Sequence, residues 1–313
     1  MRVPRITFLF GCTASGKGAV GRELARRIGG EIISVDSMKV FRRMDVGTAK
    51  PSVAARREIP HHLIDVVEPS ENFSVASFVA QADAAAGAID ARGRHVLAVG
   101  GTALYIKALS EGLFEGPAAD AAIRARLHGR AEAEGTPALH QELSRVDPEA
   151  AQRIHPNDLR RIVRALEVHE VTGRPISELQ TQWDRQRTAY PCTFVGLRRE
   201  REDQSHRINQ RVRRMIDQGL VEEVRALLAE PRPLSTTARQ ALGYAEIIEH
   251  LEAGLPLADA VENIKINTRR FAKAQRTWFK RFRQALWLDL TAGDTVEAVV
   301  DRIVQELGAL WLP

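Results

Sequence analysis

Aromatic side chains, cysteines and long apolar runs are all scarce in this sequence of 313 residues. Its two cysteines, Cys12 and Cys192, exclude a disulfide framework and favour a reducing compartment, so we expect a cytoplasmic protein. No apolar run reaches the length that spans a bilayer, and no signal peptide precedes the first apolar segment, so we expect no membrane contact. The 44% of hydrophobic and 27% of charged residues are ordinary for a globular protein, and the net charge of +5 is compatible with an anionic partner.

A glycine-rich segment lies between an apolar run at residues 6–10 and a stretch of helical periodicity that ends near Ile28. Strand, glycine loop and helix in this order are the context of a phosphate-binding loop, because successive backbone N–H groups and the helix N-terminus face one concavity. The expected phosphate-binding residues are Gly11, Cys12, Thr13, Ala14, Ser15, Gly16, Lys17 and Gly18. Gly18 replaces the Ser or Thr whose hydroxyl ligates Mg²⁺ in this motif. We therefore expect a bound polyphosphate, with Mg²⁺ held in some other way.

A second short strand is expected at residues 31–37, and it ends in a carboxylate and a hydroxyl. Residues just past the carboxyl ends of parallel strands line the ligand crevice, so Asp36 is placed to face the phosphate-binding loop. The alternative, to which we give equal weight, is that Asp36 caps a helix.

Further apolar runs at residues 62–67, 94–99, 192–197 and 285–290 alternate with helical patterns, which predicts an α/β fold. The expected architecture is a P-loop NTPase-like parallel sheet flanked by helices, with an inserted all-helical subdomain. Residues 117–186 contain helical segments and no convincing strand. We therefore divide the chain into a first part of the core (1–113), a helical insertion (114–190) and a second part of the core (191–313).

A helix predicted over residues 263–282 is strongly basic. From Lys265 to Arg283 it has eight basic and no acidic residues, which exceeds what solubility needs and predicts contacts with a phosphate backbone. A second cluster, Arg160, Arg161 and Arg164, lies in the helical insertion, where a solvated face is the usual explanation. Residues 204–228 are expected to form one long charged helix.

Eight segments carry a more specific signal: GCTASGKG, ISVDS, MDVGTAKP, HHLIDVVEP, AVGGTALYIKAL, IHPNDLRRIVRALEV, ALGYAEI and NTRRFAKAQRTWFKR. Their order and spacing resemble those of the tRNA dimethylallyltransferases, also called tRNA isopentenyltransferases (IPP transferases), over nearly the whole chain. The resemblance implies transfer of a dimethylallyl group from dimethylallyl diphosphate to the exocyclic amine of the adenosine that follows the anticodon (position 37). The substrates would be tRNAs that read codons beginning with U, bound through the anticodon stem-loop, and the product N6-dimethylallyladenosine.

The resemblance also implies roles for individual residues. The P-loop and Lys17 hold the diphosphate of the donor rather than ATP, Asp36 is the general base, and Arg211 helps to bind the diphosphate. The implied tRNA contacts are Asp36, Ser37, Met38, Lys39, Thr102, Arg124, Arg160, Arg161, Ile162, Val163, Arg164, Gln240, Ala241, Leu242, Gly243, Tyr244 and Ala245. We expect a monomer.

The chain departs from the family pattern at Cys12, Gly18, Met38, Lys39 and Phe41. Mg²⁺ would have to be held by diphosphate oxygens and water, with Ser15 or Asp36 as protein ligands, so we expect a raised Mg²⁺ requirement. The sequence has no Cys/His pair near its C-terminus that would suggest the zinc finger of eukaryotic members. We therefore expect the chain to resemble the bacterial members of the family more closely. Two alternatives remain open: a small-molecule P-loop kinase, and a tRNA-binding homologue that has lost catalysis.

Overall fold

The computed structural model describes residues 3–112, 116–180 and 190–311. The chain folds as two compact units. The larger unit combines Met1–Ser110 with Thr188–Pro313, and the smaller unit is Glu111–Arg187. None of the helices in the described ranges combines the length and the apolar character that crossing a bilayer requires.

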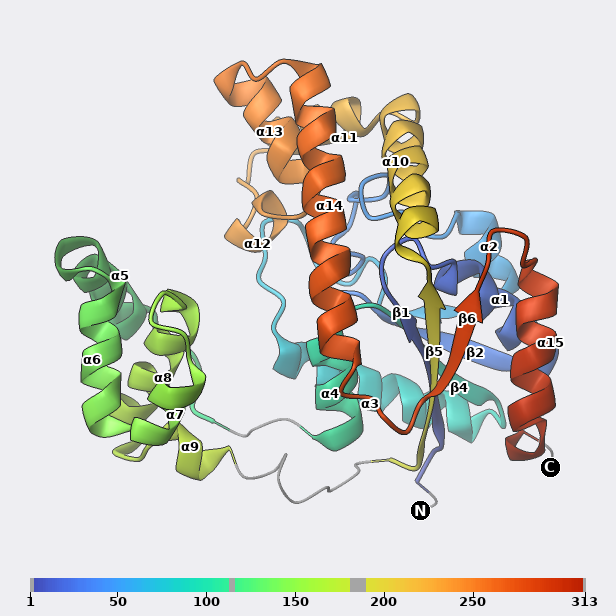
Figure 1. The fold of residues 1–313 in the computed structure, drawn as a ribbon, viewed down its shortest axis with the longest axis horizontal. Helices are drawn as coiled ribbons and strands as arrows, with labels where there is room; N and C mark the ends of the chain where they lie inside the picture. Colours follow the sequence, from blue (N-terminus) through green and yellow to red (C-terminus); the bar gives the residue numbers. More distant parts are fainter. Residues whose placement is uncertain (1–2, 113–115, 181–189, 312–313) are drawn as a thin grey trace. The chain divides into compact units, whose positions relative to one another are not determined.

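The larger unit is organised around a parallel sheet with the strand order β3-β2-β4-β1-β5-β6 (Figure 1). Its strands are β1 (Ile6–Gly11), β2 (Gly30–Val35), β3 (His61–His62), β4 (His95–Gly100), β5 (Cys192–Arg199) and β6 (Leu286–Leu290). β1 lies in the interior between β4 and β5, and its residues are all buried. The carboxyl ends of β1, β2 and β4 therefore meet at one edge of the sheet, where a crevice for a ligand is expected.

Helices cover both faces of this sheet. The helices that continue the larger unit are α1 (Lys17–Ile28), α2 (Val53–Glu58), α3 (Val75–Ala91), α4 (Ala103–Glu111), α10 (Arg201–Asp217), α11 (Leu220–Leu228), α12 (Thr236–Arg239), α13 (Tyr244–Ala253), α14 (Leu257–Phe279) and α15 (Val296–Leu307), followed by a short 3₁₀ turn (Gly308–Leu310). Of these, α11, α12 and α13 pack against α10, α14 and one another. One core joins Val20 of α1 and Val299 of α15 to one face of the sheet. The other core joins α3, α4, α10 and α14 to the opposite face. The predicted α/β class, a parallel sheet flanked by helices, is confirmed.

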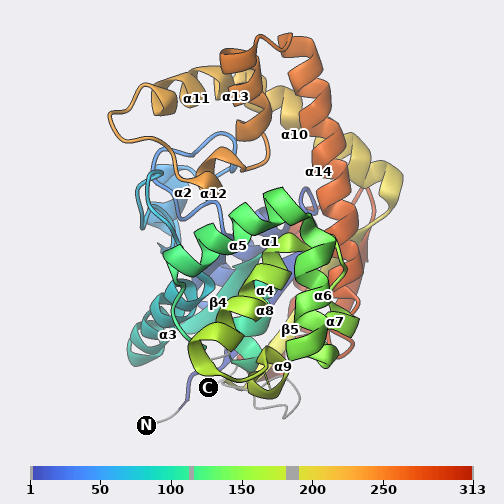
Figure 2. The same cartoon turned by 90° about the vertical axis from the view of Figure 1, so that its left-hand side faces the viewer.

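The smaller unit is helical throughout its described part (Figure 2). Its helices are α5 (Ala121–Glu134), α6 (Thr136–Val146), α7 (Pro148–Arg153), α8 (Leu159–Thr172) and α9 (Ile176–Leu179). They enclose a core of their own, in which Leu127, Leu139 and Ile162 are fully buried. The unit can therefore exclude water from its own interior.

Two of the predicted elements are wrong. The strand expected at residues 62–67 stops at His62, because Leu63 and Asp65 adopt positive φ angles of 62° and 57° that no strand tolerates. The Asp65 carboxylate accepts hydrogen bonds from Lys50 and Arg56, both at 2.6 Å, and these bonds favour the turn. The single helix expected at residues 204–228 is broken into α10 and α11 at Gly219, whose φ of 91° suits glycine alone.

Candidate active site

The phosphate-binding loop connects the end of β1 to the first turn of α1, as its sequence predicts. Ala14 and Gly16 have positive φ angles of 62° and 95°, so the backbone curls around a concavity. The amides of Gly16, Lys17 and Gly18 donate to no acceptor among the described residues. Three free N–H groups at the beginning of a helix form an anion-binding nest.

The carbonyl groups of the loop are held from outside by side chains of the second half of the chain. Gln204 Nε2 donates to Thr13 O at 3.0 Å, Arg207 Nε to Ala14 O at 3.1 Å and Arg199 Nε to Ser15 O at 3.1 Å. Because these bonds keep the carbonyl oxygens turned outward, the amides that follow are left to face the concavity. The loop is therefore pre-organised for an anion, and the sequence pattern of the loop alone could not reveal these partners.

Gln275 of α14 clamps the loop to the turn after β4. Its buried side chain accepts a hydrogen bond from Thr13 N at 2.8 Å and donates one to Gly101 O at 2.8 Å. A residue more than 260 positions away from the loop thereby fixes its geometry. The only signal for it in the sequence is its place inside the TRRFAKAQRTW segment, which gives no hint of its role.

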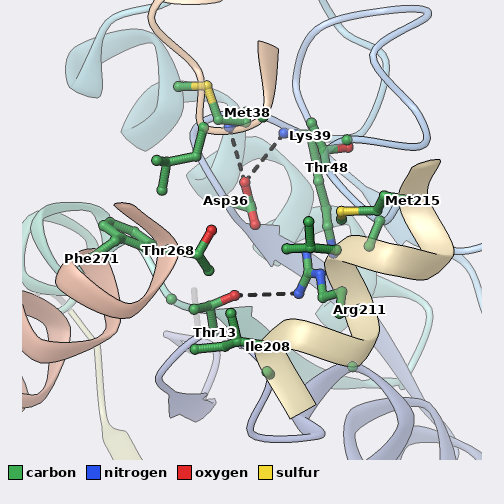
Figure 3. A pocket seen from close by; sticks show the side chains of 18 of the residues that line it. Thr13, Asp36, Met38, Lys39, Thr48, Ile208, Arg211, Met215, Thr268 and Phe271 are labelled. Atoms are coloured by element: carbon green, nitrogen blue, oxygen red, sulfur yellow. Dashed lines mark hydrogen bonds between the residues drawn. The ribbon is translucent and has the colours of Figure 1, made fainter. Parts of the chain in front are cut away.

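A cavity of about 1040 Å³ opens over the loop. Its charged lining consists of six basic residues and one acid: Lys17, Lys39, Arg207, Arg211, Arg213, Arg214 and Asp36. Apolar side chains from β2–α2, α10 and α14 line it as well, among them Met38, Ile208, Met215 and Phe271 (Figure 3). The excess of cations points to a ligand that is highly anionic at one end, and the apolar side chains allow an apolar group beside it.

Asp36 lies directly after β2, and the residues that follow it form a turn, so it does not cap a helix as one of the two predictions had it. Its Oδ1 accepts hydrogen bonds from the amides of Met38 (3.0 Å) and Lys39 (3.3 Å), which stabilises this turn. Its second carboxylate oxygen is turned toward the middle of the cavity (Figure 3). The structure thus replaces the predicted helix cap by a hydrogen-bonded turn, and leaves the other carboxylate oxygen available for a ligand.

The cations beside Asp36 perturb one another. Burial, followed by the charges of Lys39 and Arg211, lowers the pKa of Lys17 to about 8. Burial also lowers the pKa of Lys39 and that of Arg211, and the charge of Asp36 opposes this in both cases. Arg211 NH1 also donates to Thr13 Oγ1 at 3.3 Å, so it is fastened to the loop (Figure 3). Such crowding of cations around one carboxylate is expected where a multiply charged anion binds.

Most of the remaining residues expected at the site in the larger unit also line the cavity. Ser37, Met38 and Thr102 lie beside Asp36, and the Ser37 amide donates to Thr102 Oγ1 at 3.1 Å. The lining also includes Gln240, Ala241, Leu242 and Gly243, whereas Tyr244 and Ala245 are not part of it. Tyr244 is buried and donates to Glu223 Oε1 at 2.6 Å.

Glu223 is a supporting residue that the sequence did not single out. Its carboxylate accepts hydrogen bonds from the amides of Asp45 (2.9 Å), Val46 (2.8 Å) and Gly47 (3.2 Å) as well as from Tyr244. It thereby orders the loop that continues into Thr48, another lining residue.

The arginines expected to contact tRNA in the helical unit differ in their surroundings. Arg124 and Arg164 both bind Glu167, whose side chain is fully buried, at 2.8 Å and 2.6 Å. Arg160 and Arg161 are exposed, and Ile162 and Val163 are buried in the core of the unit. Arg160 and Arg161 thus present their side chains to solvent, with Arg161 Nε also 3.4 Å from Asp158 Oδ2, while Arg124 and Arg164 stabilise the unit.

The basic helix α14 is present, and its cations are distributed in a similar way. Arg276 turns inward to Gln204, and Lys265 and Arg269 pair with Glu262. Lys273, Lys280 and Arg283 are exposed, and within the described ranges their side chains have no ion-pair partner. Arg270 and Arg281 are exposed as well, but Arg270 donates to Asn267 and Arg281 lies over the Trp278 ring.

The residues present fit a protein-held metal ion poorly. Gly18 offers no hydroxyl, and Ser15 Oγ is buried without a hydrogen-bond partner beneath the loop, next to Gly11, rather than in the cavity lining. Asp36 is the one carboxylate of the lining. In the described part of the chain no three His, Cys, Asp or Glu side chains are grouped as metal ligands. Mg²⁺ prefers several oxygen ligands, which this pocket does not supply.

Comparisons with known proteins identify the family to which the chain belongs. A family model described as IPP transferase matches residues 39–282. The tRNA dimethylallyltransferase of Geobacter metallireducens is 48% identical over 285 residues, which cover 91% of this chain and 92% of the relative. Among solved structures, the tRNA isopentenylpyrophosphate transferase of Bacillus halodurans is 37% identical with a TM-score of 0.71, covering 97% of each chain.

A further solved structure, a eukaryotic dimethylallyltransferase acting on tRNA, is 25% identical and has a TM-score of 0.81 over 99% of this chain and 80% of its own length. These matches extend across both units and not only across the phosphate-binding loop, whose motif is shared by many proteins. The chain belongs to the IPP transferase family.

Proposed function

We propose that this protein transfers the dimethylallyl group of dimethylallyl diphosphate to the exocyclic amine of an adenosine in tRNA. The single observation that carries the proposal is the composition of the cavity: free loop amides and six basic side chains surround one carboxylate, with apolar side chains beside them. A diphosphate matches the cations, and a five-carbon allylic group matches the apolar lining. The names of the relatives support the same reaction.

In this mechanism the adenosine amine attacks the first carbon of the allylic group. The bond between that carbon and the diphosphate oxygen breaks, and its electron pair leaves with the diphosphate. The loop amides of Gly16–Gly18, Lys17 and Arg211 stabilise the charge that develops on the leaving group. Asp36, through the oxygen that does not cap the Met38 and Lys39 amides, accepts the proton that the amine loses.

The adenosine would have to leave its stack to reach this cavity. We place it at the position 3′ to the anticodon, in tRNAs that read codons beginning with U, so that the anticodon stem-loop is the partner and N6-dimethylallyladenosine the product. Lys273 of α14, Lys280 and Arg283 directly after it, and Arg160 and Arg161 are the residues that we assign to the tRNA backbone. We further propose that the protein acts as a monomer in the cytoplasm, where its tRNA substrate is found.

Mg²⁺ enters this proposal only as a counter-ion of the donor diphosphate, since the site itself has few ligands for it. No step of the mechanism above depends on a protein-held metal ion.

The test is a single-turnover reaction of purified protein with a labelled donor and a tRNA transcript, run beside a reaction in which ATP replaces the donor. We expect label on tRNA with dimethylallyl diphosphate and no phosphorylated product with ATP. Hydrolysis or transfer of the ATP γ-phosphate without prenyl transfer would contradict the assignment.

A further inference from the structure

The missing hydroxyl at Gly18 leaves a gap in the phosphate-binding loop, and an arginine borders that gap. Gly18 is the second residue of α1, at the position where this motif normally has the Ser or Thr that ligates Mg²⁺. A Cβ built on Gly18 would have one neighbour within 4 Å, Arg22 NH1 at 3.9 Å. Arg22 follows one helical turn later, so its guanidinium extends back along the helix toward the loop.

Arg22 has no partner that would explain its orientation. Within the described ranges its side chain forms no hydrogen bond and no ion pair. The acid beside it, Glu23, is already engaged by Arg26 and Arg27 at 2.8 Å and 2.7 Å. Arg22 is the sixth residue of α1, in the second turn of the helix, and no acidic residue in the first turn balances its charge.

The region next to Arg22 is also rich in positive charge. Burial is the main cause that lowers the pKa of Lys39, and the charges of Arg211 and Arg22 add to it. Burial, and then the charges of Arg22 and Lys39, lower the pKa of His61 to about 4, so this histidine is neutral near pH 7. Two more cations nearby are already paired, Lys50 with Asp45 and Asp65 and Arg56 with Asp65. Arg22 and Lys39 therefore lack a neutralising anion, apart from Asp36.

We infer that Arg22, with Lys39, binds the donor diphosphate in place of the hydroxyl-held metal ion of other phosphate-binding loops. This inference rests on the proposed function, because it requires a diphosphate at the loop. A guanidinium donates paired hydrogen bonds to phosphate oxygens and carries a fixed charge, so it neutralises the leaving group without a metal. Gly18 alone predicts that the enzyme needs more Mg²⁺. With Arg22 in this role, we expect it to need less Mg²⁺.

The experiment measures the affinity of the full-length protein for inorganic pyrophosphate by calorimetry, once in a metal chelator and once in excess Mg²⁺. The variant Arg22→Gln keeps a good helix former and removes the charge. The matched control is Arg26→Gln, one turn further along the same helix and exposed, with its partner Glu23 still bound by Arg27. Gly18→Thr, alone and combined with Arg22→Gln, restores the hydroxyl.

We expect the natural protein to bind pyrophosphate with similar affinity in both buffers. Arg22→Gln should weaken binding in chelator by about 10- to 100-fold, the range of one charged hydrogen bond, and by less in Mg²⁺. Arg26→Gln should behave as the natural protein does, and adding Gly18→Thr to Arg22→Gln should restore affinity in Mg²⁺ only.

Two results would overturn the inference: equal pyrophosphate affinity of the natural protein and Arg22→Gln in chelator, or loss of binding by the natural protein when the metal is removed. A natural protein that binds pyrophosphate in neither buffer contradicts the donor site itself and hence the proposed function. The thermal unfolding temperature of each variant shows whether weaker pyrophosphate binding results from the lost contact or from a destabilised fold.

Discussion

Replacing Asp36 by asparagine separates the two roles that the structure gives this residue. In the natural protein Asp36 Oδ1 accepts hydrogen bonds from the Met38 amide at 3.0 Å and from the Lys39 amide at 3.3 Å, and the oxygen of an asparagine can accept both bonds. The asparagine puts an uncharged NH₂ group in place of the second carboxylate oxygen, which faces the cavity. The turn after β2 should therefore persist, while the proton acceptor is lost. Loss of a general base typically slows the chemical step by about 10²- to 10⁴-fold.

The alanine variant provides the comparison. Asp36→Ala removes the base and the capping oxygen together, so it should show the same loss of rate and an additional destabilisation of about 0.5–2 kcal/mol. Neither substitution should weaken pyrophosphate binding, because Asp36 is the one negative charge in a pocket with six cations.

The assay is single-turnover prenyl transfer, with calorimetric pyrophosphate binding and thermal unfolding measured on the same preparations. A rate for Asp36→Asn within about tenfold of the natural protein would refute the assignment of the base, since loss of a general base costs about 10²-fold or more. A collapse of pyrophosphate affinity would instead show that Asp36 organises the anion site.

Further predictions concern the basic surface, the pKa of Lys17 and the helical unit. Changing Lys273, Lys280 and Arg283 together to glutamine should reduce the slope of log affinity for tRNA against log salt by roughly 2–3, about 0.7–0.9 for each lost phosphate contact, and an unchanged slope would mean that these side chains are merely solvated. Because Lys17 has a pKa of about 8 and must be charged to attract a diphosphate, pyrophosphate affinity should fall as pH rises through about 8. Lys39→Gln should move that midpoint upward, because Lys39 is the largest charge that lowers the pKa of Lys17, and coincident pH profiles of the two proteins would contradict this. Glu167→Leu should destabilise the helical unit by about 1–3 kcal/mol, since the buried carboxylate accepts hydrogen bonds from Arg124, Arg164 and the Asp120 amide; an unchanged midpoint of chemical denaturation would contradict this.

The parts of the site that depend on local pattern were predictable from the sequence. The order of strand, glycine loop and helix placed Lys17 and the free amides correctly, and the position of Asp36 at a strand end placed it at the cavity. Local rules sufficed in these cases because parallel strands bring their carboxyl ends to one edge.

The residues that hold the loops of the site in place by hydrogen bonds were not predictable, because each is far in sequence from the loop that it contacts. Gln275 and Gln204 fix Thr13 of the loop from α14 and α10, and Glu223 fixes the amides of residues 45–47 from α11. A polar residue on an amphipathic helix has no local signature that distinguishes such a partner from a solvated side chain. The turn at Leu63 to Asp65 was missed for the same reason, since its partners Lys50 and Arg56 stabilise it through side chains.

The most direct test of the central claim is mass spectrometry of the nucleosides of a purified tRNA that reads a codon beginning with U, after incubation with this protein and dimethylallyl diphosphate. We expect one new nucleoside, an adenosine that has gained a single dimethylallyl group on its exocyclic nitrogen, formed from the residue 3′ to the anticodon and absent when that adenosine is replaced by guanosine. Unmodified tRNA after incubation with folded protein that binds both tRNA and pyrophosphate would contradict the claim, and so would a prenyl group at any other position.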